Sequence, residues 1–151
     1  MGGNAGINDD GSGSSLNLEL ALKVYSYLPN PKNKIRFCWW GAEELGLLGS
    51  SFYVKDLQQN SPADLLKIKA NLNFDMVAST NFQRGVYNGT SDISGKGSGV
   101  IQNLFNQFFI KQGLTFVPLP FDGRSDYGPF LDVKIPAGLF SSKFEMYIFF
   151  K

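Results

Sequence analysis

The chain has 151 residues, of which 43% are hydrophobic and 18% charged, as is typical of one globular domain. Its 14 basic and 13 acidic side chains give a net charge of +1, and no cluster of lysine or arginine is dense enough to bind nucleic acid or a membrane surface. The chain contains no histidine, and its single cysteine, Cys38, lies in an apolar run and is expected to be a buried thiol. We therefore expect a single domain over residues 1–151 that binds its ligand in a pocket.

The first predicted element is a helix that follows the turn-rich stretch GINDDGSG. Apolar residues recur at every fourth position between Leu16 and Leu28, which is helical spacing, and Pro29 ends the pattern. Taken alone, GINDDGSG favours a capped surface turn. A phosphate would be repelled by Asp9 and Asp10, and the spacing around them does not match a helix-loop-helix calcium site.

The next predicted elements are a strand and two helices. Residues 35–40 form a short apolar and aromatic run, which predicts a strand covered on both faces. A helix is expected to begin near Glu43 and Glu44 and to run toward Gln59. The sequence SPAD at residues 61–64 then predicts the start of a further short helix, with serine as the cap and proline at the first helical position.

The second half of the chain continues the alternation of strands and helices. Residues 70–76 alternate between apolar and polar side chains, which predicts a strand, and a helical pattern over residues 100–113 follows. Two more strands are expected around residues 115–119 and 135–140, on either side of the turn-rich loop DGRSDYGPF. This alternation predicts an α/β fold with parallel strand pairs.

Acidic residues follow or precede these elements at the positions where α/β proteins bind ligands. Ligands of open α/β sheets bind beyond the carboxyl ends of the strands. Asp9 and Asp10 precede the first helix, Glu43 and Glu44 follow the strand over residues 35–40, and Asp75 lies at the end of the next strand. Carboxylates that meet at one edge repel one another, and a bound cation would stabilise them. We therefore expect a metal site at this edge.

Each acidic motif also has a purely structural interpretation. Glu43 and Glu44 alone are more often acids that favour a helix N-terminus, and Asp75 could be a hydrogen-bonded structural acid. Arg124 and Asp126 could form an ion pair with each other inside the loop. The sequence would contain no functional site only if all of these structural interpretations were correct at once. The combination of motifs is therefore more informative than any one motif.

Residues 1–15 do not form the apolar stretch of a signal peptide, and the tail YIFF is too short to span a bilayer. The sequence Asn88-Gly89-Thr90 is an acceptor for N-glycosylation if the protein is secreted.

The motifs GINDDGSG, RFCWWGAEELGLLGS, NLNFDM, DGRSDYGPF and IPAGLF occur in this order. Together they resemble the di-zinc metalloexopeptidases, which include secreted bacterial and fungal aminopeptidases and, more distantly, glutamate carboxypeptidase. The resemblance runs from about Ala5 to Ser142. It implies a three-layer α/β/α sandwich with a mixed, mostly parallel central sheet, incomplete at both termini, and a full-length protein that is extracellular.

The resemblance also implies a role for each acidic motif. Asp9 matches the carboxylate that bridges two zinc ions, Glu44 matches a ligand of one ion and Asp75 a ligand of the other. Glu43 matches the general base, and Arg124 lies in the segment that holds the substrate. The implied activity is zinc-dependent hydrolysis of N-terminal residues from peptides with a free N-terminus.

The sequence departs from the family pattern in two ways. The family completes each zinc site with one histidine, and neither histidine is present here. Residues 143–151 form a tail unlike the family. Without the histidines an oxygen-only ligand set remains, which binds zinc less well, so this chain is expected to have little or no activity. Two alternatives stay open: a non-catalytic remnant that binds a peptide or a partner, and a relative of glutaminyl cyclases, which use a single zinc.

Overall fold

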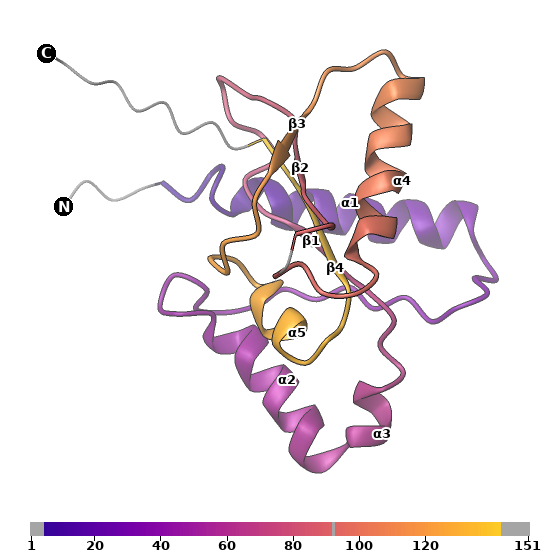
Figure 1. Ribbon diagram of the computed structural model, residues 1–151, viewed down its shortest axis with the longest axis vertical. Helices are drawn as coiled ribbons and strands as arrows, with labels where there is room; N and C mark the ends of the chain where they lie inside the picture. Colours follow the sequence, from indigo (N-terminus) through magenta and orange to yellow (C-terminus); the bar gives the residue numbers. More distant parts are fainter. Residues whose placement is uncertain (1–4, 92, 143–151) are drawn as a thin grey trace, which may run out of the picture.

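The computed structural model describes residues 5–91 and 93–142, so the predicted tail over residues 143–151 lies outside the described part of the chain. Figure 1 shows the elements in chain order. The helices are α1 (Gly11–Tyr27), α2 (Leu48–Asn60), α3 (Pro62–Leu65), α4 (Ser98–Lys111) and α5 (Gly128–Asp132). The strands are β1 (Asn71–Phe74), β2 (Gly85–Tyr87), β3 (Val117–Leu119) and β4 (Ala137–Ser141).

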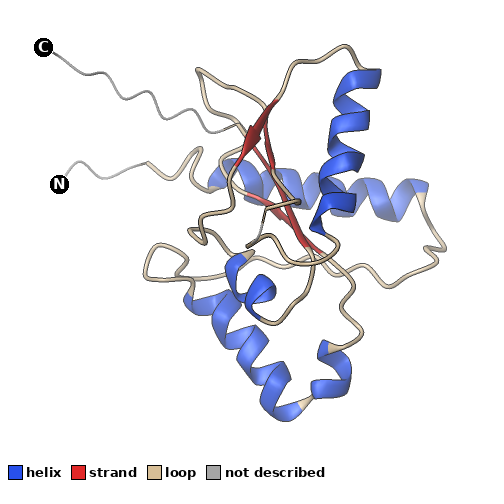
Figure 2. Ribbon diagram, in the orientation of Figure 1, coloured by secondary structure: helices blue, strands red, loops and turns tan. Residues whose placement is uncertain are grey.

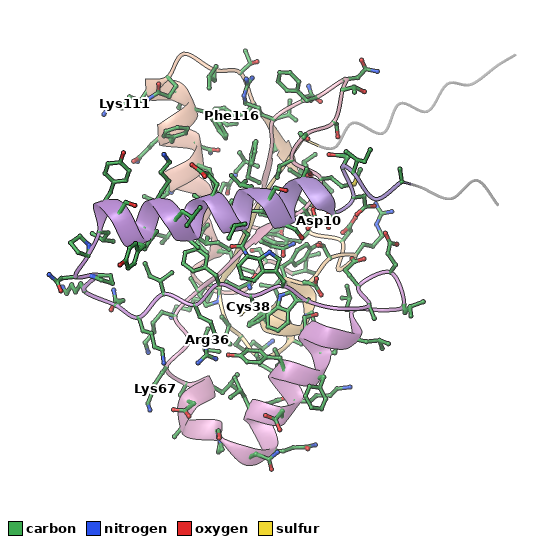
Figure 3. All side chains as sticks on the ribbon, turned by 180° about the vertical axis from the view of Figure 1, so that it is seen from behind. Asp10, Arg36, Cys38, Lys67, Lys111 and Phe116 are labelled. Carbon is green, nitrogen blue, oxygen red and sulfur yellow. The ribbon has the colours of Figure 1, made fainter. Side chains whose placement is uncertain are left out.

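The four strands form one mixed sheet in the order β1-β4-β2-β3. The β1–β4 and β2–β3 pairs are parallel, whereas β2 and β4 are antiparallel, with Val86 opposite Phe140. Figures 1 and 3 show α1 and α4 on opposite faces of this sheet. The predicted α/β fold with a mixed, mostly parallel sheet is therefore confirmed. No helix within the described residues combines the length and the apolar character that a membrane span requires.

Helix α4 packs closely against the sheet because one strand residue has no side chain. Ile101 and Phe109 are the large apolar residues that α4 buries, at 7% and 6% exposure. A Cβ added at Gly138 of β4 would lie only 2.1 Å from the Cγ2 atom of Ile101. Gly138 therefore sets the distance between the helix and the sheet.

Two groups of buried residues anchor the loops that carry the candidate site. Tyr127, which is part of the DGRSDYGPF loop, packs with Phe121 and with Leu139 of β4. Phe130 of α5 packs with Val54 of α2. These contacts fix both the loop and α2 relative to the sheet.

The structure corrects the prediction for residues 35–40, which are not a strand. Figure 2 shows the chain between α1 and α2 without a strand. Trp39 is 50% exposed, and Cys38 is half-buried rather than buried; the Cys38 carbonyl accepts a hydrogen bond from Asn17 Nδ2 at 2.9 Å instead of pairing with a strand. An apolar run indicates burial, but a strand also needs a neighbouring strand to pair with its backbone. Among the residues that the structure describes, no strand pairs with this segment.

Three further differences concern boundaries and short elements. Helix α2 begins at Leu48 rather than at the glutamates, because residues 41–47 form a turn. The short strand β2 and the short helix α5 were not predicted; α5 lies inside the loop expected to be irregular. Proline at the first turn of α5 is the signal that could have indicated it.

Candidate functional site

The acidic loop before α1 is tied to the segment that follows β1. Asp10 caps α1 and also accepts a hydrogen bond from the Met76 amide at 3.2 Å. The Oδ1 atom of Asn8 accepts a hydrogen bond from the Ala78 amide at 3.0 Å. Figure 3 shows Asp10 at the N-terminal end of α1. Asp9 lies between these two anchors, so the predicted bridging residue is held beside the segment that carries Asp75.

The carboxylate of Asp75 is oriented by the DGRSDYGPF loop. Ser125 donates a hydrogen bond from Oγ to Asp75 Oδ2 at 2.7 Å. The same Oγ accepts a hydrogen bond from Asn73 Nδ2, also at 2.7 Å. Met76, directly after Asp75, adopts a left-handed backbone conformation with φ of 53°. Such strain costs about 1–3 kcal/mol and persists where the surroundings fix the geometry, often at functional sites.

Glu43 and Glu44 lie in a tight turn rather than in a helix. The amides of Gly46 and Leu47 both donate to the Glu43 carbonyl, at 2.9 and 2.8 Å. Ala42, immediately before Glu43, has a positive φ of 58°. Leu47 also has a positive φ, of 57°, so the turn that carries the two glutamates is separated from α2.

The turn brings Glu43 among the other predicted acidic residues. Burial and, after it, the negative charges of Asp75, Asp126, Glu44 and Asp9 together raise the pKa of the Glu43 carboxyl to about 7. These charges act on Glu43 because they lie near it. Asp75, Glu44 and Asp9 therefore lie close enough to Glu43 for their charges to raise its pKa.

Asp10 has the second perturbed carboxyl of this cluster. Its pKa is raised to about 6, chiefly because the carboxyl is partly desolvated. The charges of Asp75 and Asp9 add to the rise, and the amide hydrogen bonds from Met76 and Gly13 oppose it. Sequence analysis placed Asp10 beside Asp9 but gave it no role. Its hydrogen bonds make it the residue that joins the acidic loop to the end of β1.

Asp126 is a member of the cluster that sequence analysis missed. It is 8% exposed, and Ser50 of α2 donates a hydrogen bond to its Oδ1 at 2.5 Å. Burial raises the pKa of Asp126, the Ser50 hydrogen bond opposes the rise, and Asp75 adds to it. Arg124 Nε forms its ion pair with Asp122 Oδ2, at 2.7 Å, and not with Asp126 as in the alternative structural interpretation of this loop.

The loop that carries Arg124 is fixed by a buried tyrosine. The Tyr127 hydroxyl accepts hydrogen bonds from the amides of Asp122 and Gly123 and donates to Asp122 Oδ1 at 2.8 Å. Arg124 and Asp75 line the same small cavity of about 40 Å³. The predicted substrate-binding residue therefore lies beside the predicted metal-binding acid.

These residues do not make a zinc site on their own. Structural and catalytic zinc sites use three or four nitrogen, oxygen or sulfur ligands per ion. Within residues 5–91 and 93–142, no group of three or more His, Cys, Asp or Glu side chains is positioned to hold a metal ion. The sequence also supplies no histidine. The described residues therefore do not form a closed zinc site in this structure.

Comparison with protein families gives a match to peptidase family M28 over residues 1–148, a stretch that reaches into the predicted tail. The chain belongs to peptidase family M28.

Known relatives share most of this chain but are much longer. Leucine aminopeptidase 2 of Trichophyton equinum is 45% identical over 137 residues, which are 88% of this chain and 27% of that protein. A solved zinc aminopeptidase from Bacillus subtilis is 34% identical with a TM-score of 0.74, over 90% of this chain and 32% of that one. A glutaminyl cyclase from an Acidobacteriales bacterium is 19% identical with a TM-score of 0.59 over 89% of this chain and 46% of that one, a likeness of fold alone. The chain thus spans about a quarter to a third of the length of the aminopeptidases it matches.

Proposed function

We propose that this chain is the part of a zinc aminopeptidase that supplies the acidic residues of the active site. The enzyme would remove N-terminal residues from peptides, with Glu43 as the general base. The observation that carries the proposal is the position of the Glu43 carboxyl among Asp75, Asp126, Glu44 and Asp9, with its pKa raised to about 7. A general base works best when its pKa lies near the working pH. Membership of peptidase family M28 supports peptides as the substrate class.

Glu43 would take a proton from the attacking water and pass it to the leaving amine. Positioned proton transfer of this kind contributes about 10²–10⁴-fold to rate. Arg124, which lines the same cavity as Asp75, would hold the substrate through hydrogen bonds to a peptide carbonyl. A carboxylate close to this cavity would pair with the α-ammonium group of a free N-terminus, which selects exopeptidase over endopeptidase activity.

In the complete enzyme we propose that Asp9, Glu44 and Asp75 would help to hold two zinc ions, which would lower the pKa of the attacking water. The residues of this chain supply three carboxylates toward such a centre but not the two histidines that complete the family's sites. We therefore expect the 151-residue chain by itself to have little or no activity. Secretion of the complete enzyme is part of the same proposal.

The test is a chimera in which residues 5–142 replace the matching segment of the Bacillus subtilis zinc aminopeptidase. The chimera should cleave leucyl-p-nitroanilide and bind about two zinc ions by elemental analysis, as expected of a two-metal hydrolase. The isolated chain should stay near background in the same assay with added zinc.

The two alternatives predict other results for the same chimera. A non-catalytic remnant gives a folded, zinc-loaded chimera that does not hydrolyse the substrate. A relative of glutaminyl cyclases cyclises a peptide with N-terminal glutamine in preference to hydrolysing leucyl-p-nitroanilide. Either result would reject the aminopeptidase proposal.

A further inference from the structure

The acceptor sequence Asn88-Gly89-Thr90 lies outside the candidate site and forms a defined turn at the end of β2. Asn88 Oδ1 accepts two hydrogen bonds from Thr90, one from the amide at 3.1 Å and one from the Oγ1 hydroxyl at 2.7 Å. Both bonds are made to the oxygen of the Asn88 side-chain amide. The acceptor hydroxyl of the motif is therefore already in contact with the amide of the asparagine that the motif would modify.

The nitrogen of the same amide is not held by a hydrogen bond within the described residues. Among the described residues, Asn88 Nδ2 donates to no other group, and it is not one of the buried polar atoms that lack a partner. Thr90 is exposed and Asn88 is half-buried. A reagent that approaches from solvent thus meets the nitrogen, while the oxygen is held by the turn.

The backbone of the turn is anchored on the side away from this nitrogen. The Asn88 amide donates to the Leu119 carbonyl at 2.7 Å, and the Gly89 amide donates to Gln102 Oε1 of α4 at 3.0 Å. A Cβ at Gly89 would lie 2.2 Å from the carbonyl carbon of Ser98, so only glycine fits between the two residues of the motif. The folded chain therefore presents the motif in one fixed conformation.

The surface next to the turn is open and polar. A hollow of about 500 Å³ begins at Gly89 and Thr90. Its lining combines glycines, the hydroxyl or amide side chains of Thr90, Ser91, Ser94 and Asn103, and the side chains of Lys96 and Val100. Hydroxyl and amide groups are suitable hydrogen-bond partners for sugar hydroxyls. The first sugar of an attached chain has room there without displacing an apolar contact.

We propose that Asn88 is the attachment site of an N-linked oligosaccharide. The donor is a lipid-pyrophosphate-linked oligosaccharide: its C1–O bond to pyrophosphate breaks, a C1–N bond to Asn88 Nδ2 forms, and Nδ2 loses one proton. The lipid pyrophosphate leaves with the electron pair of the broken bond. Asn88 is the single Asn-X-Ser/Thr acceptor, with X other than proline, in the 151 residues. The proposal does not depend on peptidase activity.

The experiment expresses the whole chain behind a cleavable secretory leader in yeast and analyses the tryptic peptide of residues 85–96 by mass spectrometry. The wild-type peptide should carry hexose and N-acetylhexosamine at Asn88, and an endoglycosidase should remove the sugar from the undenatured protein. Thr90→Ala should abolish the modification and Thr90→Ser should keep it. Asn88→Gln provides the unmodified reference.

Cell extract and medium are both analysed, so the result can be read even if a variant is not exported. A wild-type chain with its leader removed but residue 88 unmodified would overturn the proposal. Sugar that the endoglycosidase releases only after denaturation would overturn the exposed position of Asn88 Nδ2. Modification of Thr90→Ala to the wild-type extent would reject the role of the Thr90 hydroxyl.

Discussion

Ser125 donates a hydrogen bond to the Asp75 carboxylate at 2.7 Å and so joins the DGRSDYGPF loop to the end of β1. The two residues are 50 positions apart in the sequence, and Ser125 is 6% exposed. The bond sets the orientation of Asp75 because the same serine is held from its other side by Asn73.

The first prediction concerns this bond. Ser125→Ala removes a hydrogen bond to a charged acceptor, which contributes about 1.5–3 kcal/mol, so the free energy of unfolding should fall by about that amount. Urea unfolding of the metal-free chain measures it. Ser26→Ala is the matched control, because the Ser26 hydroxyl bonds only the Leu22 carbonyl on an exposed helix face. An equal loss of unfolding free energy in both variants would contradict a larger contribution from the Ser125 hydrogen bond.

The second prediction concerns the contact between α4 and β4. Gly138→Ala places a methyl group 2.1 Å from Ile101 Cγ2, and overpacking of this kind costs about 1–3 kcal/mol. Gly41→Ala is the control, because a Cβ there meets no atom within 4 Å. Thermal unfolding followed by circular dichroism should show a lower midpoint for Gly138→Ala alone. An unchanged midpoint would mean that the helix does not pack on the sheet at this glycine.

Tyr127 gives a third prediction, on the loop that carries Arg124. Tyr127→Phe leaves the amides of Asp122 and Gly123 without their acceptor, which costs about 1–3 kcal/mol of unfolding free energy. In the chimera the same variant should raise KM for the peptide substrate, because Arg124 loses its fixed loop. Tyr25→Phe, at a position 84% exposed, should change neither quantity. A Tyr127→Phe protein as stable as wild type would contradict the anchoring role of the hydroxyl.

The fourth prediction is the pH dependence of stability without metal. The folded-state pKa of Asp10 is raised from 3.8 to about 6, and that of Glu43 from 4.5 to about 7. Between these values the folded state binds more protons than the unfolded state, so the free energy of unfolding should fall as the pH rises from about 4 to about 7. Urea unfolding in the presence of a chelator measures the slope.

The control for this slope is Glu43→Gln, which removes one of the two titrating carboxyls. The slope of Glu43→Gln should be smaller than that of the wild-type chain over the upper part of the range, between about 5 and 7. Stability of the wild-type chain that rises with pH across this range would contradict the raised pKa values.

The fold was predictable wherever periodicity and tertiary pairing agree. The helical spacing from Leu16 to Leu28 became α1, and the alternation around Asp75 became β1, although β1 ends at Phe74. The prediction of a strand over residues 35–40 was wrong because an apolar run does not specify which strand would pair with it. The three-residue strand β2 is too short for any periodic signal.

The sequence motifs predicted which residues belong to the candidate site, but not the backbone conformation or the hydrogen bonds that position them. Sequence order placed Asp9, Glu43 and Asp75 next to predicted elements, and in the structure the charges of Asp75 and Asp9 both act on Glu43. Their roles at a metal site stay a prediction. The backbone of Glu43 could not be foreseen, because its turn depends on positive φ at Ala42 rather than on a helix start. Asp126 was missed because its role depends on Ser50, which is 76 positions away.

The most direct test of the account is Glu43→Gln in the chimera with the Bacillus subtilis enzyme. If Glu43 is the general base, kcat for leucyl-p-nitroanilide should fall about 10²–10⁴-fold, while zinc content and thermal stability stay close to those of the parent chimera. Glu19→Gln, on the exposed face of α1, should leave kcat unchanged. A Glu43→Gln chimera that keeps kcat within about threefold of its parent would contradict the assignment of Glu43 as the proton acceptor.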